Sequence, residues 1–208
     1  LDILVIDDNS PDQTSHIVKK LQKKYKNLHL IKRSSKKGLD TAHKLIYKYA
    51  IKKKYDYLIT MDADLSHNPS SIPKFLKEIK NYDFVIGSRY IHGGRNNLKG
   101  YRLLLSKYGN IFIKIVTRIN ISEFTTSYRC FNLKKLKKFN LSVIKTKGYS
   151  FFMSSVYLLH HLGYKIQEIP IVFHERNYGK SKIPKIEIFR TLFNLFFLKY
   201  YFLKKYEI

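Results

Sequence analysis

The chain has 208 residues and a formal net charge of +25, from 40 Lys and Arg against 15 Asp and Glu. Its hydrophobic content of 44% and aromatic content of 15% exclude a disordered basic tail, because they suffice to build a core. A single cysteine excludes an internal disulfide and a zinc site built from several cysteines. The charge leaves three partner classes open: nucleic acid, an anionic membrane surface and a small phosphorylated substrate.

The first half of the chain alternates short apolar runs with lysine-rich amphipathic segments. This pattern predicts strands at residues 1–6, 28–31, 57–61 and 83–87, and helices that end near residues 25, 53 and 80. Pro69 and Pro73 suit the start of the third helix. Because strands and helices alternate, we predict an α/β fold with a mostly parallel sheet flanked by helices. No repeat or composition break divides residues 1–208, so a single catalytic domain is expected.

The second half is less regular, and a Gly93-Gly94 loop marks the change. Its pattern predicts helices near 103–119, 133–139 and 151–162, a short segment at 127–131 and a strand at 166–172.

A final helix is expected within residues 185–208, after Pro184. This segment is both basic and apolar, so it suits either a membrane interface or packing on the domain. Its most apolar part, residues 188–203, is shorter than the roughly 20 residues that a membrane-spanning helix needs.

Two pairs of carboxylates follow predicted strands: Asp7 with Asp8, and Asp62 with Asp64. Ligands bind beyond the carboxyl ends of the strands in an open parallel sheet. Carboxylates placed there can share a divalent cation whose coordination substrate phosphates complete, which indicates a nucleoside diphosphate. The alternative is that Asp8 and Asp64 only form turns or cap helices. Two acidic pairs in a chain so poor in acids favour the ligand site.

Four segments carry a family resemblance in their order and spacing. They are residues 7–14 (DDNSPDQT), 61–69 (MDADLSHNP), 87–90 (GSRY) and 176–182 (RNYGKSK). The chain resembles the inverting GT-A glycosyltransferases that make dolichyl- or polyprenyl-phosphate mannose. The resemblance implies a GT-A fold and transfer of mannose from GDP-mannose to dolichyl or polyprenyl phosphate, with inversion. It also implies Mg²⁺ or Mn²⁺ and a peripheral location on the cytoplasmic face of a membrane: endoplasmic reticulum in a eukaryote, plasma membrane in a prokaryote.

The resemblance assigns donor and metal roles to positions at the ends of two strands. Ile6 and Asp8 match positions that hold the base and ribose of the donor. Asp62, Ala63 and Asp64 match the D-x-D segment that binds nucleotide and metal, with Asp62 and Asp64 as the metal ligands.

The resemblance also assigns the positions that would contact phosphate. Arg89 and Arg176 match arginines that contact the donor and its developing charge, and Lys182 matches a basic residue of a closing loop. Arg102 and Ser106, at i, i+4 spacing on one helix face, match positions associated with the lipid phosphate. The expected catalytic groups are Asp64, Arg89, Arg176 and Lys182. An acceptor phosphate is already anionic, so no carboxylate base is expected.

The chain departs from the family pattern at several positions. Ser66 stands where many relatives have a metal-binding Gln, and Ser127 replaces a glycine, so the backbone there is expected to differ if that glycine needs positive φ. The family's first strand, which lies centrally in the sheet, is absent. We therefore expect an open seam and an incomplete base pocket, and a chain that is a fragment or a degenerate copy.

Two further residues are candidates for the site, and three other functions remain open. Arg129 is a third candidate for the acceptor phosphate, and His67 is expected to support the metal motif rather than to bind metal. The alternatives are a sibling transferase that uses UDP-glucose or another donor, an inactive scaffold, and a basic nucleic-acid-binding protein. No nucleic acid is expected as a partner, because no known binding signature appears and the acidic pairs at the strand ends would repel phosphates unless metal were bound. Most lysines are predicted to be solvated surface.

Overall fold

The structure is a computed structural model in which residues 1–175, 190–191 and 193–198 are described. Its strands are β1 (Ile3–Asp7), β2 (Leu28–Lys32), β3 (Tyr57–Thr60), β4 (Phe84–Ser88), β5 (Arg95–Asn96), β6 (Arg129–Asn132), β7 (Ile166–Pro170) and β8 (Val172–Phe173). Its helices are α1 (Thr14–Lys24), α2 (Leu39–Lys52), α3 (Ile72–Glu78), α4 (Gly100–Thr117) and α5 (Gly148–His161), with short 3₁₀ helices η1 (Pro69–Ser71) and η2 (Leu141–Val143). The described residues after 189 are helical and are called the C-terminal helix below.

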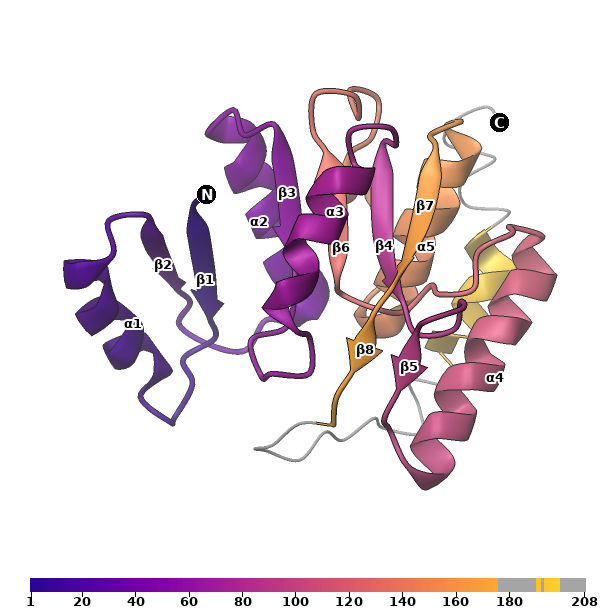
Figure 1. The fold of residues 1–208 in the computed structure, drawn as a ribbon, viewed down its shortest axis with the longest axis horizontal. Helices are drawn as coiled ribbons and strands as arrows, with labels where there is room; N and C mark the ends of the chain where they lie inside the picture. The colour runs from indigo at the N-terminus through magenta and orange to yellow at the C-terminus, as the bar shows by residue number, and fades with distance from the viewer. Residues whose placement is uncertain (176–189, 192, 199–208) are drawn as a thin grey trace.

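The described strands form three separate sheets. β1 pairs with β2 in parallel, β5 pairs with β8 in parallel, and the four-stranded sheet has the order β3-β6-β4-β7. Within that sheet β4 and β7 are parallel, while β6 is antiparallel to both of its neighbours. Figure 1 shows β1 and β2 beside α1, apart from β3. Because no described pairing joins β1 to the four-stranded sheet, the expected open seam is confirmed.

The four-stranded sheet is covered on both faces, and strand alternation explains how. In Figure 1, α3 lies in front of the sheet, and α2 and α5 lie behind it. Successive side chains of a strand point to opposite faces. Accordingly Phe84 and Ile86 of β4 join the core cluster that contains α5, whereas Val85 joins the cluster formed with α3. A strand that is buried on both faces is apolar at successive positions, as β4 is from Phe84 to Ile86.

Two predicted elements differ from the structure. Residues 133–139 form turns instead of a helix, because the i→i+4 bond from Leu136 N–H to the Asn132 carbonyl (3.0 Å) is not continued: the N–H of Lys137 bonds to Lys135 (2.9 Å) and that of Phe139 to Leu136 (3.1 Å). The predicted strand 166–172 is divided into β7 and β8 just after Pro170, which has no N–H for a ladder. The third helix begins as expected: η1 carries Pro69 and α3 carries Pro73 in its first turn.

His43 of α2 lies in the core against aromatic side chains. It is 7% exposed, and its ring centroid lies 4.9 Å from that of Phe152 in an edge-on arrangement. Burial, with the neighbouring charge of Arg129, lowers the pKa of His43 from 6.5 to about 3. His43 is therefore neutral in the folded protein near neutral pH.

Folding stability is expected to decrease as the pH falls below 6.5 towards 3. Because the folded-state pKa of His43 is the lower one, the unfolded state binds a proton that the folded state does not, so the stabilisation is complete only above the unfolded pKa. One such group gives a slope of about 1.4 kcal/mol per pH unit. Urea unfolding at several pH values should show a flatter profile for His43→Leu. The exposed His16→Gln variant should keep the wild-type slope; equal slopes for all three proteins would contradict the prediction.

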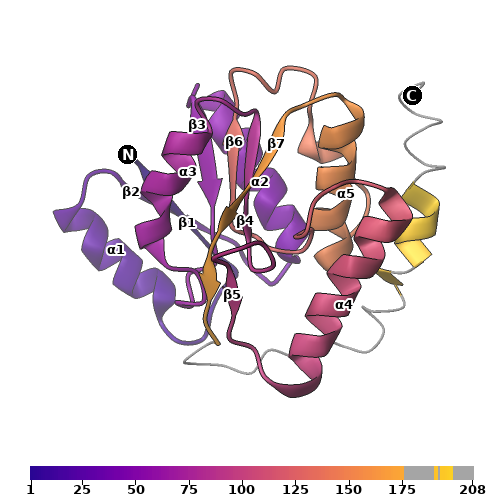
Figure 2. The same cartoon turned by 45° about the vertical axis from the view of Figure 1, so that its right-hand side comes forward.

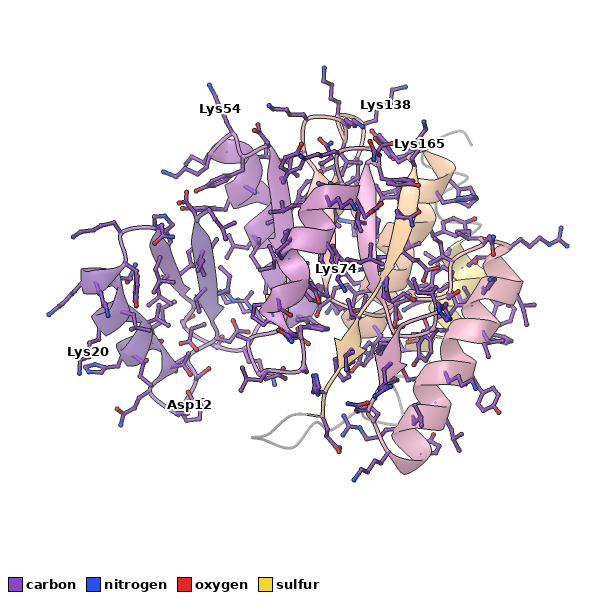
Figure 3. All side chains as sticks on the ribbon, in the orientation of Figure 1. Asp12, Lys20, Lys54, Lys74, Lys138 and Lys165 are labelled. Atoms are coloured by element: carbon purple, nitrogen blue, oxygen red, sulfur yellow. The ribbon has the colours of Figure 1, made fainter. Side chains whose placement is uncertain are left out.

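The lysines lie largely at the surface. Figure 3 shows Lys20, Lys54, Lys138 and Lys165 pointing away from the body of the protein, and all four are exposed. Among the described residues, no helix is long and apolar enough to cross a membrane.

Candidate active site

A cavity of about 230 Å³ lies beside the ends of β3 and β4. The strand ends and the loop before β6 contribute mostly polar residues to its lining, namely Asp62, His67, Arg89, Thr125, Thr126 and Ser127. Helices α4, α5 and the C-terminal helix contribute mostly apolar ones, among them Leu105, Phe112, Ile113, Phe152 and Leu195. The cavity therefore combines charged groups with an apolar wall.

Asp62 follows β3 and is held by two neighbours. The Ser127 hydroxyl donates to Asp62 Oδ1 at 2.7 Å, and the backbone N–H of Asp62 donates to His67 Nδ1 at 3.0 Å. His67 is buried, and burial is the main reason that its pKa lies below its ordinary value. Its ring is therefore neutral, and its approach of 3.9 Å to Asp62 Oδ2 is not an ion pair. As expected from the sequence, His67 supports Asp62.

Asp64 is partly exposed and does not line the cavity. Its Oδ1 accepts hydrogen bonds from the Ser66 hydroxyl at 2.5 Å and from the Ser66 N–H at 3.1 Å. Ser66 is fully buried, and its hydroxyl orients Asp64. Ala63, between the two carboxylates, is exposed.

The pair Asp62 and Asp64 suits a divalent cation that also binds substrate. Mg²⁺ is commonly held by one or two carboxylates, with phosphate oxygens and water completing the octahedron. No group of three or more His, Cys, Asp and Glu side chains that could hold a metal occurs among the described residues. The two carboxylates would therefore hold an ion only together with a phosphorylated ligand.

Arg89, directly after β4, is buried in a two-pronged ion pair with Glu123. Its Nε donates to Glu123 Oε2 at 2.6 Å and its Nη2 donates to Oε1 at 2.9 Å. Burial alone disfavours both charges, but their mutual attraction outweighs it: the pKa of Glu123 is lowered and that of Arg89 is raised. A Cβ at position 94 would lie 2.6 Å from the carbonyl oxygen of Ser88, so Gly94 allows the close turn after β4.

Arg102 and Ser106 lie on α4 and both line the cavity, as their helical spacing predicted. The Ser106 hydroxyl accepts a hydrogen bond from Tyr90 at 2.7 Å. Arg102 Nε is buried and has no hydrogen-bond partner among the described residues, while Nη1 donates to Glu175 at 3.4 Å. Buried polar groups normally have partners. Arg102 therefore lies at the cavity with one buried nitrogen for which the described residues provide no partner.

Asp8, at the end of β1, is paired with Arg33. Both of its oxygens accept hydrogen bonds, from Arg33 Nε at 2.5 Å and Nη2 at 2.6 Å. Arg33 also donates to Thr41 at 2.6 Å. Ile6 is half-buried on β1 and lies opposite Ile31 of β2. Neither Ile6 nor Asp8 lines the cavity, so the structure does not bring them together with Asp62.

Comparisons with known proteins decide the family. The family model described as "Glycosyl transferase family 2" matches residues 1–139. The chain belongs to glycosyl transferase family 2. It is therefore a glycosyltransferase enzyme.

Two curated relatives of this glycosyltransferase are similar along most of its length. The undecaprenyl-phosphate mannosyltransferase of Micrococcus luteus is 34% identical over 183 residues, which cover 88% of this chain and 75% of the relative. The polyprenol monophosphomannose synthase of Mycolicibacterium smegmatis is 34% identical over 196 residues, or 93% of this chain and 74% of the relative.

Solved structures show the fold. Glucosyl-3-phosphoglycerate synthase of Mycobacterium tuberculosis, in complex with Mn²⁺, uridine-diphosphate and phosphoglyceric acid, superimposes with a TM-score of 0.64 at 12% identity. The match covers 95% of this chain and 67% of that one. The glycosyltransferase thus has the predicted GT-A fold.

One expectation about the acceptor phosphate needs correction. Arg129 cannot hold an acceptor phosphate, because its side chain is fully buried and donates to the carbonyls of Phe124 (2.7 Å), Thr126 (2.7 Å) and Phe152 (3.1 Å). At Ser127, which stands where the family pattern has a glycine, φ is not positive.

Two expected phosphate-binding residues, Arg176 and Lys182, lie outside the described residues. Conversely, the sequence did not predict three partners of the candidate residues: Glu123 beside Arg89, the hydroxyl of Ser127 beside Asp62, and Arg33 beside Asp8. A signal for Glu123 exists, since it is the only acidic residue in the stretch 84–167 of this basic chain. Arg33 and Ser127 carry no comparable signal, because their partners are distant in sequence.

Proposed function

We propose that the enzyme transfers mannose from GDP-mannose to polyprenyl or dolichyl phosphate, with inversion at the anomeric carbon. The cavity is the observation that carries the proposal. Arg89 and Arg102 suit a phosphate, while Leu105, Phe112 and Phe152 form a wall that suits the first isoprene units of a lipid. A wholly hydrophilic acceptor would leave this wall without a partner. The names of both curated relatives agree with a polyprenol acceptor.

The proposed site residues form two groups, one that would bind the sugar donor and one that would bind the lipid phosphate acceptor. Asp62 and Asp64 would hold Mg²⁺ or Mn²⁺ against the diphosphate of GDP-mannose; when bound, this ion would stabilise the departing negative charge. Ile6, Asp8 and Ala63 are proposed for the base and ribose. Arg176 and Lys182 are proposed to contact the departing diphosphate.

Arg102, Ser106 and Arg89 would hold the acceptor phosphate. An oxygen of this phosphate attacks the anomeric carbon from the face opposite the donor diphosphate, and the bond from that carbon to the diphosphate oxygen breaks. GDP leaves with the bonding electron pair. Because the attacking oxygen is already anionic, no group has to remove a proton, and the protein contributes orientation and electrostatics.

The test is incubation of the purified protein with GDP-mannose, undecaprenyl phosphate and Mn²⁺, followed by mass analysis of the extracted lipid. We expect a mannosyl phospholipid. The same assay with UDP-glucose separates the sibling transferase from the proposed one. A glucosyl product alone would contradict the donor, and no lipid product with any sugar nucleotide would contradict the acceptor.

Replacing Arg102 with alanine is expected to raise KM for the lipid phosphate about 10- to 100-fold, with kcat less affected. A lost hydrogen bond to a charged group removes about 1.5–3 kcal/mol of binding energy. Steady-state kinetics at varied acceptor concentration measure this. Lys107→Ala, on the same helix but exposed and outside the cavity lining, should leave KM unchanged. Equal effects of the two variants would argue against a specific phosphate contact.

We also propose that the enzyme is peripheral to the cytoplasmic face of a membrane. The outer face of α4 supports this, because apolar residues at helical spacing are exposed. These residues, called the α4 stripe, are Tyr101 (66%), Leu104 (53%), Tyr108 (61%), Ile111 (43%) and Ile115 (67%). Figure 2 shows the C-terminal helix beside α4. Phe193 and Phe196 of that helix are also exposed. An exposed apolar face with lysines nearby suits an anionic lipid interface.

Binding to phosphatidylglycerol vesicles is expected to depend on the α4 stripe. The double variant Leu104→Glu with Ile115→Glu should bind at least about 100-fold more weakly, since each large apolar side chain contributes roughly 1.5–3 kcal/mol when buried. Flotation of the vesicles measures this. The control is Ile17→Glu on α1, an apolar residue that is 54% exposed away from the stripe. Unchanged flotation of the double variant would contradict membrane docking through α4.

A further inference from the structure

Glu123 is the most deeply buried carboxylate among the described residues, with no exposed surface. A buried charge is costly unless it is paired and hydrogen-bonded. Glu123 does not line the cavity itself, but its partners Arg89, Thr125 and Thr126 do. Glu123 can therefore affect the cavity only through these partners.

The loop before β6 fixes Glu123. Its Oε1 accepts hydrogen bonds from the Thr125 N–H at 3.0 Å, the Thr125 hydroxyl at 2.9 Å and the Thr126 N–H at 3.2 Å. Two of these donors belong to the backbone, which places the carboxylate without relying on flexible side chains. Glu123 is thus a fixed acceptor for the guanidinium opposite it.

Glu123 in turn fixes the plane of Arg89. Two parallel N–H···O bonds define the orientation of a guanidinium, which a single contact cannot do. Thr125 adds a third bond, from Arg89 Nη2 at 3.0 Å, and the rings of Tyr90 and Phe173 both lie 5.2 Å from Arg89 Cζ. Within the described part of the chain, the hydrogen bonds of Arg89 use Nε and Nη2, and none uses Nη1.

We propose that Glu123 is a positioning residue, which holds Arg89 so that Nη1 remains available to the acceptor phosphate. The proposal rests on the proposed function, because that phosphate is the one of the polyprenyl acceptor. Arg89 and Glu123 together carry no net charge, so Arg89 contributes a directed donor more than a long-range field. The effect of removing the Glu123 charge on phosphate binding therefore separates a positioning role of Glu123 from a purely electrostatic one. Removing the Glu123 charge should tighten phosphate binding if only the field matters, and should weaken it if orientation matters.

The test measures Kd for undecaprenyl phosphate in detergent micelles. Five proteins are compared: the wild type, Glu123→Gln, Glu123→Asp, Arg89→Lys, and the double variant Glu123→Gln with Arg89→Lys. We expect Kd to rise about tenfold for Glu123→Gln and for Arg89→Lys, and less for Glu123→Asp, which keeps the charge. The double variant should bind no more weakly than Arg89→Lys, because Glu123 acts through Arg89. Equal or tighter binding by Glu123→Gln, or additive losses in the double variant, would overturn the proposal.

A control separates positioning from a general loss of stability. Tyr47→Phe removes a buried hydrogen bond to the Phe139 carbonyl, 3.1 Å long and outside the cavity lining. This variant should lower Tm but leave Kd for the lipid phosphate unchanged. A raised Kd in Tyr47→Phe as well would assign the effect of Glu123→Gln to stability and overturn the proposal.

A spectroscopic measurement tests the Arg89–Glu123 pair without any substrate. In ¹H–¹⁵N spectra, the Arg89 Nε–H signal, assigned by its loss in Arg89→Lys, should exchange slowly with water in the wild type and at least about tenfold faster in Glu123→Gln. Equally slow exchange in both would overturn the proposal. If the wild type shows the slow signal yet does not bind undecaprenyl phosphate, the acceptor assigned under the proposed function is wrong, while Glu123 still positions Arg89.

Discussion

Asp62→Asn is expected to lower kcat/KM for sugar transfer about 1000-fold, or about 4 kcal/mol of transition-state stabilisation. The structure explains why this carboxylate should matter more than its neighbour. Asp62 lines the cavity and is held by Ser127 and His67, whereas Asp64 lies outside the lining and is oriented by Ser66. Asparagine keeps the size and the hydrogen-bond acceptor of Asp62, so the variant removes the charge with little change of shape.

The measurement is initial rate at varied Mn²⁺ and donor concentration for Asp62→Asn, Asp64→Asn and Asp56→Asn. Asp56 is exposed and paired with Lys134 at 2.9 Å, away from the cavity, so Asp56→Asn should keep wild-type kinetics. Asp64→Asn is expected to lose less activity than Asp62→Asn, and excess Mn²⁺ should restore part of it. Wild-type activity of Asp62→Asn without added metal would contradict the proposed role of the carboxylate pair.

The strand ends could be located from the sequence because the residues that indicate them are neighbours in the chain. A buried strand is a short apolar run, and the polar residues that follow it must lie at the sheet edge. Asp62 and Asp64 were identified in this way, whereas Arg89 was assigned from the family resemblance and lies directly after β4. The helix predicted at residues 133–139 was wrong for the same reason. The apolar spacing of this lysine-rich segment is that of a helix, but its backbone hydrogen bonds form a series of turns after Asn132.

The partners of the site residues could not be predicted from the sequence, because they come from distant segments. Arg89 and Glu123 are 34 residues apart, and Ser127 and Asp62 are 65 apart. Side-chain pairing over such distances depends on how β6 enters between β3 and β4. A local pattern contains no information on that strand order.

Arginine and lysine differ in burial, a difference that the net charge does not show. The buried cations of the described residues are arginines, Arg89 and Arg129, and no described lysine is buried. A guanidinium is more weakly hydrated than an ammonium group and offers five donors in a plane, so it can be buried among several acceptors. Lysine keeps its charge in water, which is why most of the +25 is surface charge.

Arg129 is the clearest case, and replacing it with methionine is expected to destabilise the fold by about 3 kcal/mol or more. Its guanidinium donates to three backbone carbonyls and to the hydroxyl of Ser155, all buried. Methionine fills similar volume but leaves these acceptors unpaired, at about 1–3 kcal/mol for each group that water cannot reach. Burial lowers the pKa of Arg129 itself, so the charged guanidinium is disfavoured there and these hydrogen bonds offset part of that cost.

Urea unfolding of Arg129→Met gives the loss directly, and acceptor KM at a temperature where the variant is folded gives its effect on binding. We expect KM within about threefold of the wild type, because a residue that never reaches the cavity cannot contact the substrate. Arg95→Met, on exposed β5, should change stability by no more than about 0.5 kcal/mol. A stable Arg129→Met protein with weakened acceptor binding would instead place Arg129 among the phosphate-binding residues, as the sequence first suggested.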